Sequence, residues 1–219
     1  MPAIIFDLDG TLVDSAAAIC DIANAYMRER GLPALSLSEA RGYIGHGAPS
    51  FLINALKARD GGYDEASFPK HFARYQQIYA EAPGSANAPF PGVVDTLKTL
   101  HAGGAKLAVC TNKPGAPTKI VLDAHGWGGY FDAVISGDTL EKRKPDPEPL
   151  YEAARRLGTT PVIYVGDSDV DAATAKAAAI PFFLFTEGYR KAEVKDLPHA
   201  VAFSDFSSLP GLIANHLKA

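Results

Sequence analysis

FDLDGTLVDS, residues 6–15, places two carboxylates, Asp7 and Asp9, at the point where a short apolar run ends before Gly10. Two local structures fit this stretch. Apolar and polar residues alternate from Phe6 to Val13 around an Asp-Gly pair, a pattern typical of a β-hairpin. Alternatively, PAIIF at residues 2–6 is a buried strand whose carboxyl end carries both acids. The rest of the chain decides between them.

Residues 15–87 show only helical patterns. A capping-box pattern, Ser36 with Glu39, opens one of the predicted helices. Gly31 follows an alanine-rich run and is typical of a helix end. Apolar residues recur at helical spacing through this segment. The predicted helices cover residues 15–30, 36–44, 49–58 and 67–80, and residues 82–92 form a connector.

From residue 93 onward, helix and strand patterns alternate strictly. The strands are nearly continuous apolar runs, as expected when helices cover both faces of a sheet. This predicts an α/β fold with a doubly wound parallel sheet, formed by residues 1–14 and 88–219 and interrupted by the helical insertion 15–87. The predicted strands are AKLAVC (105–110), DAVIS (132–136), VIYVG (162–166) and PFFLF (181–185).

Ligands of open parallel sheets bind beyond the carboxyl ends of the strands. Four segments that follow predicted strands carry polar groups, and together they disfavour the hairpin. They are DLDGT (7–11), TNK (111–113), KRKPDP (142–147) and GDSDVD (166–171).

Four carboxylates, those of Asp7, Asp9, Asp167 and Asp171, would repel one another at this edge unless a cation lay among them. Oxygen ligands with no nearby histidine or cysteine suit Mg²⁺. An EF-hand does not explain DSDVD, because its sixth and twelfth positions are alanines, Ala172 and Ala178. The sequence therefore predicts a magnesium site.

The composition limits the partners. The chain has 219 residues, a net charge of −4 and 47% hydrophobic residues, which argues against a nucleic-acid-binding protein. Cys20 and Cys110 are isolated, and neither a membrane span nor a signal peptide is recognisable. We expect a cytoplasmic protein, a monomer or a homodimer, that contacts neither membrane nor nucleic acid.

A metal beside a lysine and a threonine hydroxyl is suited to hold a phosphate. The sequence lacks a G-x-S-x-G elbow, a phosphate-binding P-loop and a dinucleotide fingerprint. A carboxylate can itself attack phosphorus and form an aspartyl-phosphate. In this hypothesis Asp7 attacks, and Asp9 protonates the leaving oxygen and later activates water.

Less specific interpretations remain for two of these segments. Thr111 and Asn112 could simply cap the next helix. Lys144 lies in a charged run that could be a solvated loop, in which Lys142 or Arg143 could equally be the useful cation.

The four segments, in this order, resemble the haloacid dehalogenase superfamily in its phosphatase branch. The resemblance implies a Rossmann-like core with a helical cap. It implies that Asp7, the backbone carbonyl of Asp9 and Asp167 bind Mg²⁺, and that Asp171 supports the site. It assigns phosphate binding to Thr111, Asn112 and Lys144, with Lys144 selected by the proline that follows it.

More narrowly, four longer segments resemble bacterial phosphoglycolate phosphatases: YIGHGAPSFLINAL (43–56), VCTNKP (109–114), SGDTLEKRKPDPEPL (136–150) and TEGY (186–189). The second acid, Asp9, favours a phosphate ester as substrate, and phosphoglycolate is the best candidate. A sugar-phosphate phosphatase, a mutase similar to β-phosphoglucomutase and a non-enzymatic binding protein remain as alternatives.

Substrate choice is expected to come from the insertion, because the core motifs recognise only phosphate and metal. The segment RGYIGHG, residues 41–47, offers Arg41, His46 and the backbone amides of Gly45 and Gly47 as donors for a substrate carboxylate. The alternative is a helix-terminating turn with Arg41 in solvent.

Overall fold

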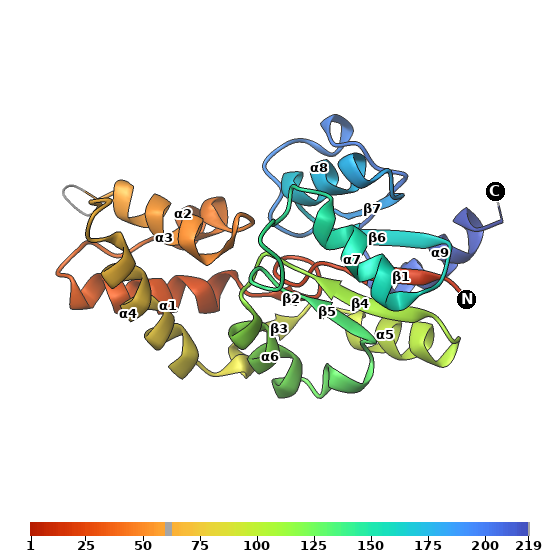
Figure 1. The fold of residues 1–219 in the computed structure, drawn as a ribbon, viewed down its shortest axis with the longest axis horizontal. Coiled ribbons are helices and arrows are strands. Elements are labelled where there is room, and N and C mark those ends of the chain that lie inside the picture. The colour runs from red at the N-terminus through yellow and green to blue at the C-terminus, as the bar shows by residue number, and fades with distance from the viewer. Residues whose placement is uncertain (60–62, 219) are drawn as a thin grey trace.

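The computed structural model describes residues 1–59 and 63–218, and in these residues six parallel strands form one sheet in the order β5-β4-β1-β6-β7-β8 (Figure 1). Every neighbouring pair in the sheet is parallel. The strands are β1 (Ala3–Phe6), β4 (Lys106–Cys110), β5 (Ala133–Ile135), β6 (Val162–Gly166), β7 (Phe182–Phe185) and β8 (Val201–Phe203).

Helices cover both faces of this sheet, which confirms the predicted doubly wound fold. In β1, Ile4 and Phe6 join the core on one face, and Ala3 and Ile5 join the core on the other. This alternation follows from the two-residue period of a strand, and it explains why the whole strand is apolar. One face is covered by α5 (Val93–Ala102), α6 (Gly115–Ala124) and α9 (Leu209–His216), and the other by α7 (Glu148–Leu157) and α8 (Asp169–Ala178).

Four helices between the first and second strands of the sheet form a separate unit with its own apolar cluster. Figure 1 shows this helical unit on the left, beside the α/β layers. The predicted capping box of Ser36 and Glu39 is present at the start of the second helix. The four helices are α1 (Ala16–Glu29), α2 (Leu37–Tyr43), α3 (Gly47–Lys57) and α4 (Phe68–Glu81).

The chain enters and leaves the helical unit through two short antiparallel strands, β2 (Val13–Asp14) and β3 (Ala88–Pro89). The hairpin considered for residues 6–13 is not formed, because β1 pairs with the parallel strands β4 and β6. Instead the chain turns at Gly10, where φ is +88° and a Cβ atom would lie 2.5 Å from a carboxylate oxygen of Asp167. A side chain at this position would therefore both strain the backbone and collide with the acid.

Among the strands and α-helices of the described residues, four were not predicted: β8, α9 and the paired strands β2 and β3, of which β3 falls in the expected connector. Strands of two or three residues contain too little sequence to show a period. The two cysteines, Cys20 and Cys110, are free, as expected. Within the described residues, no helix is both long and apolar enough to cross a membrane.

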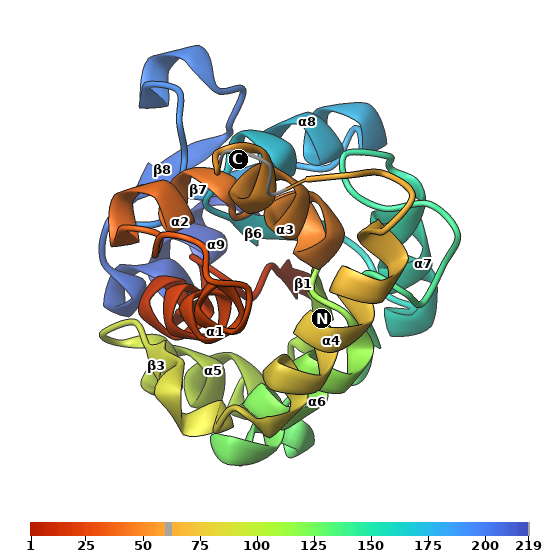
Figure 2. The ribbon, with the colours of Figure 1, turned by 90° about the vertical axis from the view of Figure 1, so that its left-hand side faces the viewer.

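Viewed from the side of the helical unit, α1, α3 and α4 lie around β1 (Figure 2). The register of β1 places Phe6 beside Val109 of β4 and beside Val165 of β6. The carboxyl ends of β1, β4 and β6 therefore lie side by side, at the edge of the sheet that faces the helical unit. This edge of the sheet is where the four polar segments meet.

Candidate active site

Asp7 extends the central strand into the middle of the site. Its backbone N–H donates to the carbonyl of Val165, 2.9 Å away, so that the segment stays attached to β6. Thr111 and Asp167 directly follow the two neighbouring strands, and all three side chains are buried. The parallel register thus brings together residues that lie far apart in the sequence, as predicted.

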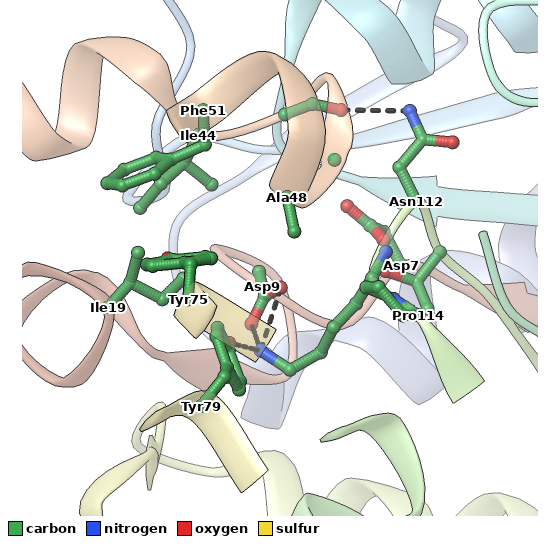
Figure 3. Close-up of a pocket in the computed structure, with 14 residues that line it drawn as sticks. Asp7, Asp9, Ile19, Ile44, Ala48, Phe51, Tyr75, Tyr79, Asn112 and Pro114 are labelled. Atoms are coloured by element: carbon green, nitrogen blue, oxygen red, sulfur yellow. Dashed lines mark hydrogen bonds and ion pairs between the residues drawn. The ribbon is translucent and has the colours of Figure 1, made fainter. Parts of the chain in front are cut away.

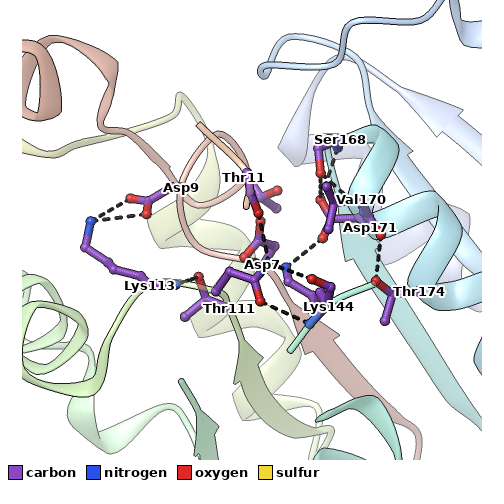
Figure 4. Close-up of polar contacts among 12 residues, drawn as sticks. Asp7, Asp9, Thr11, Thr111, Lys113, Lys144, Ser168, Val170, Asp171 and Thr174 are labelled. Carbon is purple, nitrogen blue, oxygen red and sulfur yellow. Dashed lines mark hydrogen bonds and ion pairs between the residues drawn. The ribbon is translucent and has the colours of Figure 1, made fainter. Parts of the chain in front are cut away.

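Lys144 lies between two of the three acids that cluster at this edge (Figure 4). Its Nζ atom is 2.9 Å from Oδ1 of Asp7 and 2.7 Å from Oδ1 of Asp171. Oxygen atoms of Asp7, Asp167 and Asp171 all lie within 4.8 Å of one another, and the three residues are buried. One lysine against three buried carboxylates leaves an excess of negative charge.

The pKa directions reflect this excess. Burial raises the pKa of Asp7 to about 7, and the charge of Lys144 opposes that rise only in part. Burial, followed by the charges of Asp171 and Asp7, raises the pKa of Asp167 well above its usual value. For Asp171, burial is outweighed by the charge and hydrogen bond of Lys144, and its pKa is lowered. A bound cation would favour the charged forms of Asp7 and Asp167.

The hydrogen bonds distinguish Asp171 from Asp7. Both oxygens of Asp171 are occupied: Oδ1 accepts from Lys144 and from the Tyr164 hydroxyl at 2.5 Å, and Oδ2 accepts from the Ser168 hydroxyl at 2.6 Å. Oδ1 of Asp7 is buried without a hydrogen-bond partner, although Lys144 lies within ion-pair distance. The all-oxygen donor set of Asp7 and Asp167 fits Mg²⁺, whereas Asp171 is positioned to hold Lys144.

Asp167 is oriented by two contacts that sequence reasoning missed. The Thr11 hydroxyl donates to Oδ1 at 2.7 Å, and the backbone N–H of Tyr189 donates to Oδ2 at 2.6 Å. The Tyr189 hydroxyl in turn donates to Asp14 of β2, at the entrance to the helical unit. Thr11 belongs to the DLDGT segment and could have been selected from it. Tyr189 belongs to the TEGY segment after β7, which carried the family resemblance but was assigned no role in the site.

Asp9 is paired with a lysine that was not predicted to belong to the site. The Nζ atom of Lys113 lies 2.9 and 3.1 Å from the two carboxylate oxygens of Asp9 and 2.6 Å from the Tyr79 hydroxyl (Figure 3). Asp9 and Tyr79 raise the pKa of Lys113 against the effect of burial, so the ammonium keeps its charge. Its position directly after TN was the only signal available in the sequence.

Thr111 and Asn112 do not cap the next helix with their side chains. Helix α6 follows Pro114, and the N–H of its first residue, Gly115, donates to Oδ1 of Asp138 at 2.8 Å. The Thr111 hydroxyl accepts from the N–H of Lys113. The capping alternative is therefore wrong.

The side chain of Asn112 connects the helical unit with the loop that contains Lys144. Its amide nitrogen donates to the carbonyls of Gly45 and Lys144, each at 2.9 Å, and its Oδ1 accepts from the N–H of Lys144 at 3.1 Å. Both polar atoms of the Asn112 side chain are therefore occupied within the protein. The cation next to this loop is Lys144, because Lys142 is exposed and pairs with Asp146 and Glu148.

A pocket of about 480 Å³, partly open to solvent, lies between the strand ends and the helical unit (Figure 3). Its core side carries Asp7, Asp9 and the segment 111–114, and its helical side is largely apolar. The helical side consists of Ile19, Ile44, Gly45, Gly47, Ala48, Phe51, Tyr75 and Tyr79.

Of the four residues proposed from segment 41–47, the structure brings only Gly45 and Gly47 to the pocket. Gly47 has a φ of +83°, and a Cβ there would lie 3.0 Å from the carbonyl oxygen of Asn112, so glycine permits a close backbone approach. Arg41 and His46 do not line the pocket. Arg41 is half exposed and lies 3.6 Å from Asp14, and His46 precedes α3 without a side-chain capping bond.

Residues 4–185 match the family of haloacid dehalogenase-like hydrolases. A phosphoglycolate phosphatase of Cereibacter sphaeroides is 45% identical over 219 residues, which is 100% of both chains. One from Rhodobacter capsulatus is 42% identical and covers 97% of this chain and 96% of its own. The crystal structure of a predicted phosphoglycolate phosphatase from Haemophilus somnus is 29% identical, with a TM-score of 0.90 over 97% of this chain and 98% of the other. Sequence, fold and strand-end residues agree, and this chain therefore belongs to the haloacid dehalogenase-like hydrolase family.

Proposed function

We propose that this protein is a magnesium-dependent phosphate monoester hydrolase whose substrate is phosphoglycolate. The observation that carries this proposal is the buried carboxylate of Asp7, which lies beside Lys144 and faces a small pocket at the end of the central strand. The relatives named phosphoglycolate phosphatase, which match over the whole chain, support the choice of substrate.

Asp7, Asp167 and the backbone carbonyl of Asp9 would hold Mg²⁺. When bound, the ion supplies positive charge that offsets the charge of the phosphoryl group. Lys144, which contacts Asp7, supplies a second positive charge, and Asp171 keeps Lys144 in place. The Thr111 hydroxyl and the backbone of Asn112 complete the phosphate cradle.

An oxygen of Asp7 attacks phosphorus, and the ester P–O bond breaks as the aspartyl-phosphate forms. Asp9 donates its proton to the leaving alcohol oxygen. Asp9 then accepts a proton from the water that attacks phosphorus, which releases inorganic phosphate and restores Asp7. Asp9 lines the same pocket as Asp7, which supports its role as acid and base.

The helical insertion, residues 15–87, is proposed to act as a cap domain. Its apolar side chains cover the strand ends and limit the access of bulk water, which favours transfer to Asp7 over direct attack by water. The paired strands β2 and β3 place both connections at one point, which suits a hinge.

The test is phosphate release from a panel of small esters, with and without Mg²⁺, for the wild type and Asp7→Asn. We expect phosphoglycolate to be hydrolysed with the highest kcat/KM, and Asp7→Asn to lose at least roughly 10³-fold, because an amide cannot form the acyl phosphate. Ordinary activity in Asp7→Asn would refute the nucleophile. Transfer of phosphate between positions of a sugar phosphate, without release, would instead indicate a mutase.

A further inference from the structure

The pocket contains one positively charged side chain, that of Lys113, to which the proposed mechanism assigns no role in phosphate binding. Among the described residues that line it, Lys113 is the only lysine or arginine, since Lys144 lies behind Asp7 and Arg41 lies outside. The helical side presents two side-chain polar groups, the hydroxyls of Tyr75 and Tyr79, and of these the Tyr79 hydroxyl contacts Lys113. A substrate with a second anionic group would therefore find Lys113 and Tyr79 as its side-chain donors.

Lys113 is already positioned for such a group. Its side chain is only 2% exposed, and its Nζ atom contacts both oxygens of Asp9 and the Tyr79 oxygen. Because Lys113 donates to the Tyr79 oxygen, the Tyr79 proton is free to be donated elsewhere, and no acceptor for it occurs among the described residues. The pair offers an ammonium and a hydroxyl to one carboxylate.

Lys113 is paired with Asp9, the residue that is proposed to donate and accept the proton in catalysis. Both oxygens of Asp9 contact the ammonium, so Asp9 cannot turn fully to a leaving oxygen while this pair is intact. An incoming carboxylate can replace Asp9 at Lys113 without leaving the buried ammonium unpaired. Substrate binding would then release the Asp9 carboxylate, which takes up a proton from solvent before it donates that proton to the leaving oxygen.

We propose that Lys113 and Tyr79 form the subsite for the carboxylate of the substrate, and that occupation of this subsite frees Asp9 for proton transfer. The inference rests on the proposed function. A single methylene separates the phosphate from the carboxylate in phosphoglycolate, which fits a pocket in which Asp7 and Lys113 both lie on the wall. Because Tyr79 comes from α4, the subsite exists only when the helical unit covers the strand ends.

The experiment compares phosphoglycolate with 2-hydroxyethyl phosphate, which replaces the carboxylate by a neutral hydroxymethyl group and keeps an alkyl leaving group. The measured quantity is the ratio of the two kcat/KM values, because Lys113→Gln removes both the contact to the carboxylate and the carboxylate-dependent release of Asp9, and each of these losses lowers the preference for phosphoglycolate. We expect the wild type to prefer phosphoglycolate by at least about tenfold, since charge-assisted hydrogen bonds to a buried carboxylate are strong.

Lys113→Gln should bring this ratio close to one. Tyr79→Phe, which removes only the hydroxyl, should lower it about threefold to tenfold, roughly one hydrogen bond. Lys113→Arg keeps the charge and should retain part of the preference, which guards against misfolding of the glutamine variant. Lys119→Gln is the matched control, because Lys119 is exposed on α6 and pairs with Asp123.

Two failures can be told apart. A wild type that hydrolyses phosphoglycolate no better than the neutral ester overturns the proposed substrate. A wild-type preference that survives unchanged in Lys113→Gln and Tyr79→Phe overturns the carboxylate subsite alone and leaves Lys113 as the partner of Asp9.

Discussion

The two walls of the pocket are built in opposite ways. On the core side, buried charges contact one another: Lys144 joins Asp7 to Asp171, and each acid has a distinct environment. On the helical side, apolar side chains and the backbone of Gly45 and Gly47 form the surface. The core wall is thus equipped for one reaction, whereas the helical wall restricts what can reach it.

The contacts between the walls are few and specific. Asn112 donates to the carbonyl of Gly45, and Lys113 donates to the Tyr79 hydroxyl. Asn112 and Lys113 both belong to the segment that follows β4. This one loop of the core therefore makes both hydrogen bonds to the helical unit. If this division is correct, substitutions in the two walls should differ in kind, and those in the connecting loop should show both effects.

The largest effect is expected for Lys144→Met. Removing the lysine leaves two buried carboxylates without their cation, which should cost about 3–5 kcal/mol of unfolding free energy in metal-free protein. Turnover should fall roughly 10³-fold, because the charge beside the phosphate is also lost. Chemical denaturation and phosphate release measure the two losses. Lys142→Met, an exposed control, should change neither, and equal effects in both variants would move the role away from Lys144.

Asp9→Asn should separate substrates by leaving group. Esters of alkyl alcohols need a proton donor and should slow by roughly 10²–10³-fold, whereas an activated aryl phosphate should lose less than about tenfold. The comparison requires kcat/KM for phosphoglycolate and for an aryl phosphate on the same preparation. Losses of the same size on both esters would contradict the role of Asp9 as acid and base.

Asn112→Ala should lower both the stability of the fold and kcat/KM, because Asn112 contacts both walls of the pocket. It removes three hydrogen bonds that hold the Lys144 loop and Gly45, so we expect a loss of about 1–3 kcal/mol in stability and about tenfold in kcat/KM. Asn215→Ala, exposed on α9, is the matched control for denaturation and kinetics. If Asn112→Ala keeps both stability and kcat/KM, the two walls are not coupled through this loop.

The smallest effect, confined to the helical unit, is expected for Glu39→Gln. Hydrogen bonds from Arg59, and then from Ser36, lower the pKa of Glu39 to about 2. A lowered pKa stabilises the fold above the unfolded value near 4.5 and loses this contribution as the pH falls toward 2. Denaturation should therefore show a lower midpoint for the variant at pH 7 and a smaller difference at pH 4. Glu65→Gln, exposed in the same unit, should show no such pH dependence.

Much of the core site could be predicted because each of its motifs is a short, continuous stretch of sequence. Asp7, Thr111 and Asp167 each follow an apolar run, and parallel strands bring such positions to one edge. The choice of Lys144 over Lys142 and Arg143 came from family resemblance, and the burial of Lys144 is consistent with it. Lys113 was missed because its partner Asp9 lies 104 residues away, and nothing near Lys113 in the sequence indicates a buried ion pair.

The side-chain donors proposed on the helical side, Arg41 and His46, do not line the pocket. Gly45 and Gly47 both line the pocket, and at Gly47 the backbone lies close to the carbonyl of Asn112. Where Arg41 and His46 would lie depended on the turns at Gly45 and Gly47, whose φ values of +119° and +83° no pattern specified. Arg41 lies near Asp14 instead.

The sequence by itself determined the alternation of strands and helices, the helical insertion and the polar groups at the strand ends. Hydrophobic period and turn residues act over a few positions, so a single chain already shows them. Only the tertiary structure decided that Tyr79 meets Lys113, that Asn112 bridges Gly45 and Lys144, and that the helical wall is apolar. Such contacts depend on how one folded unit docks on another, and docking is set by the shape of whole surfaces rather than by neighbouring residues.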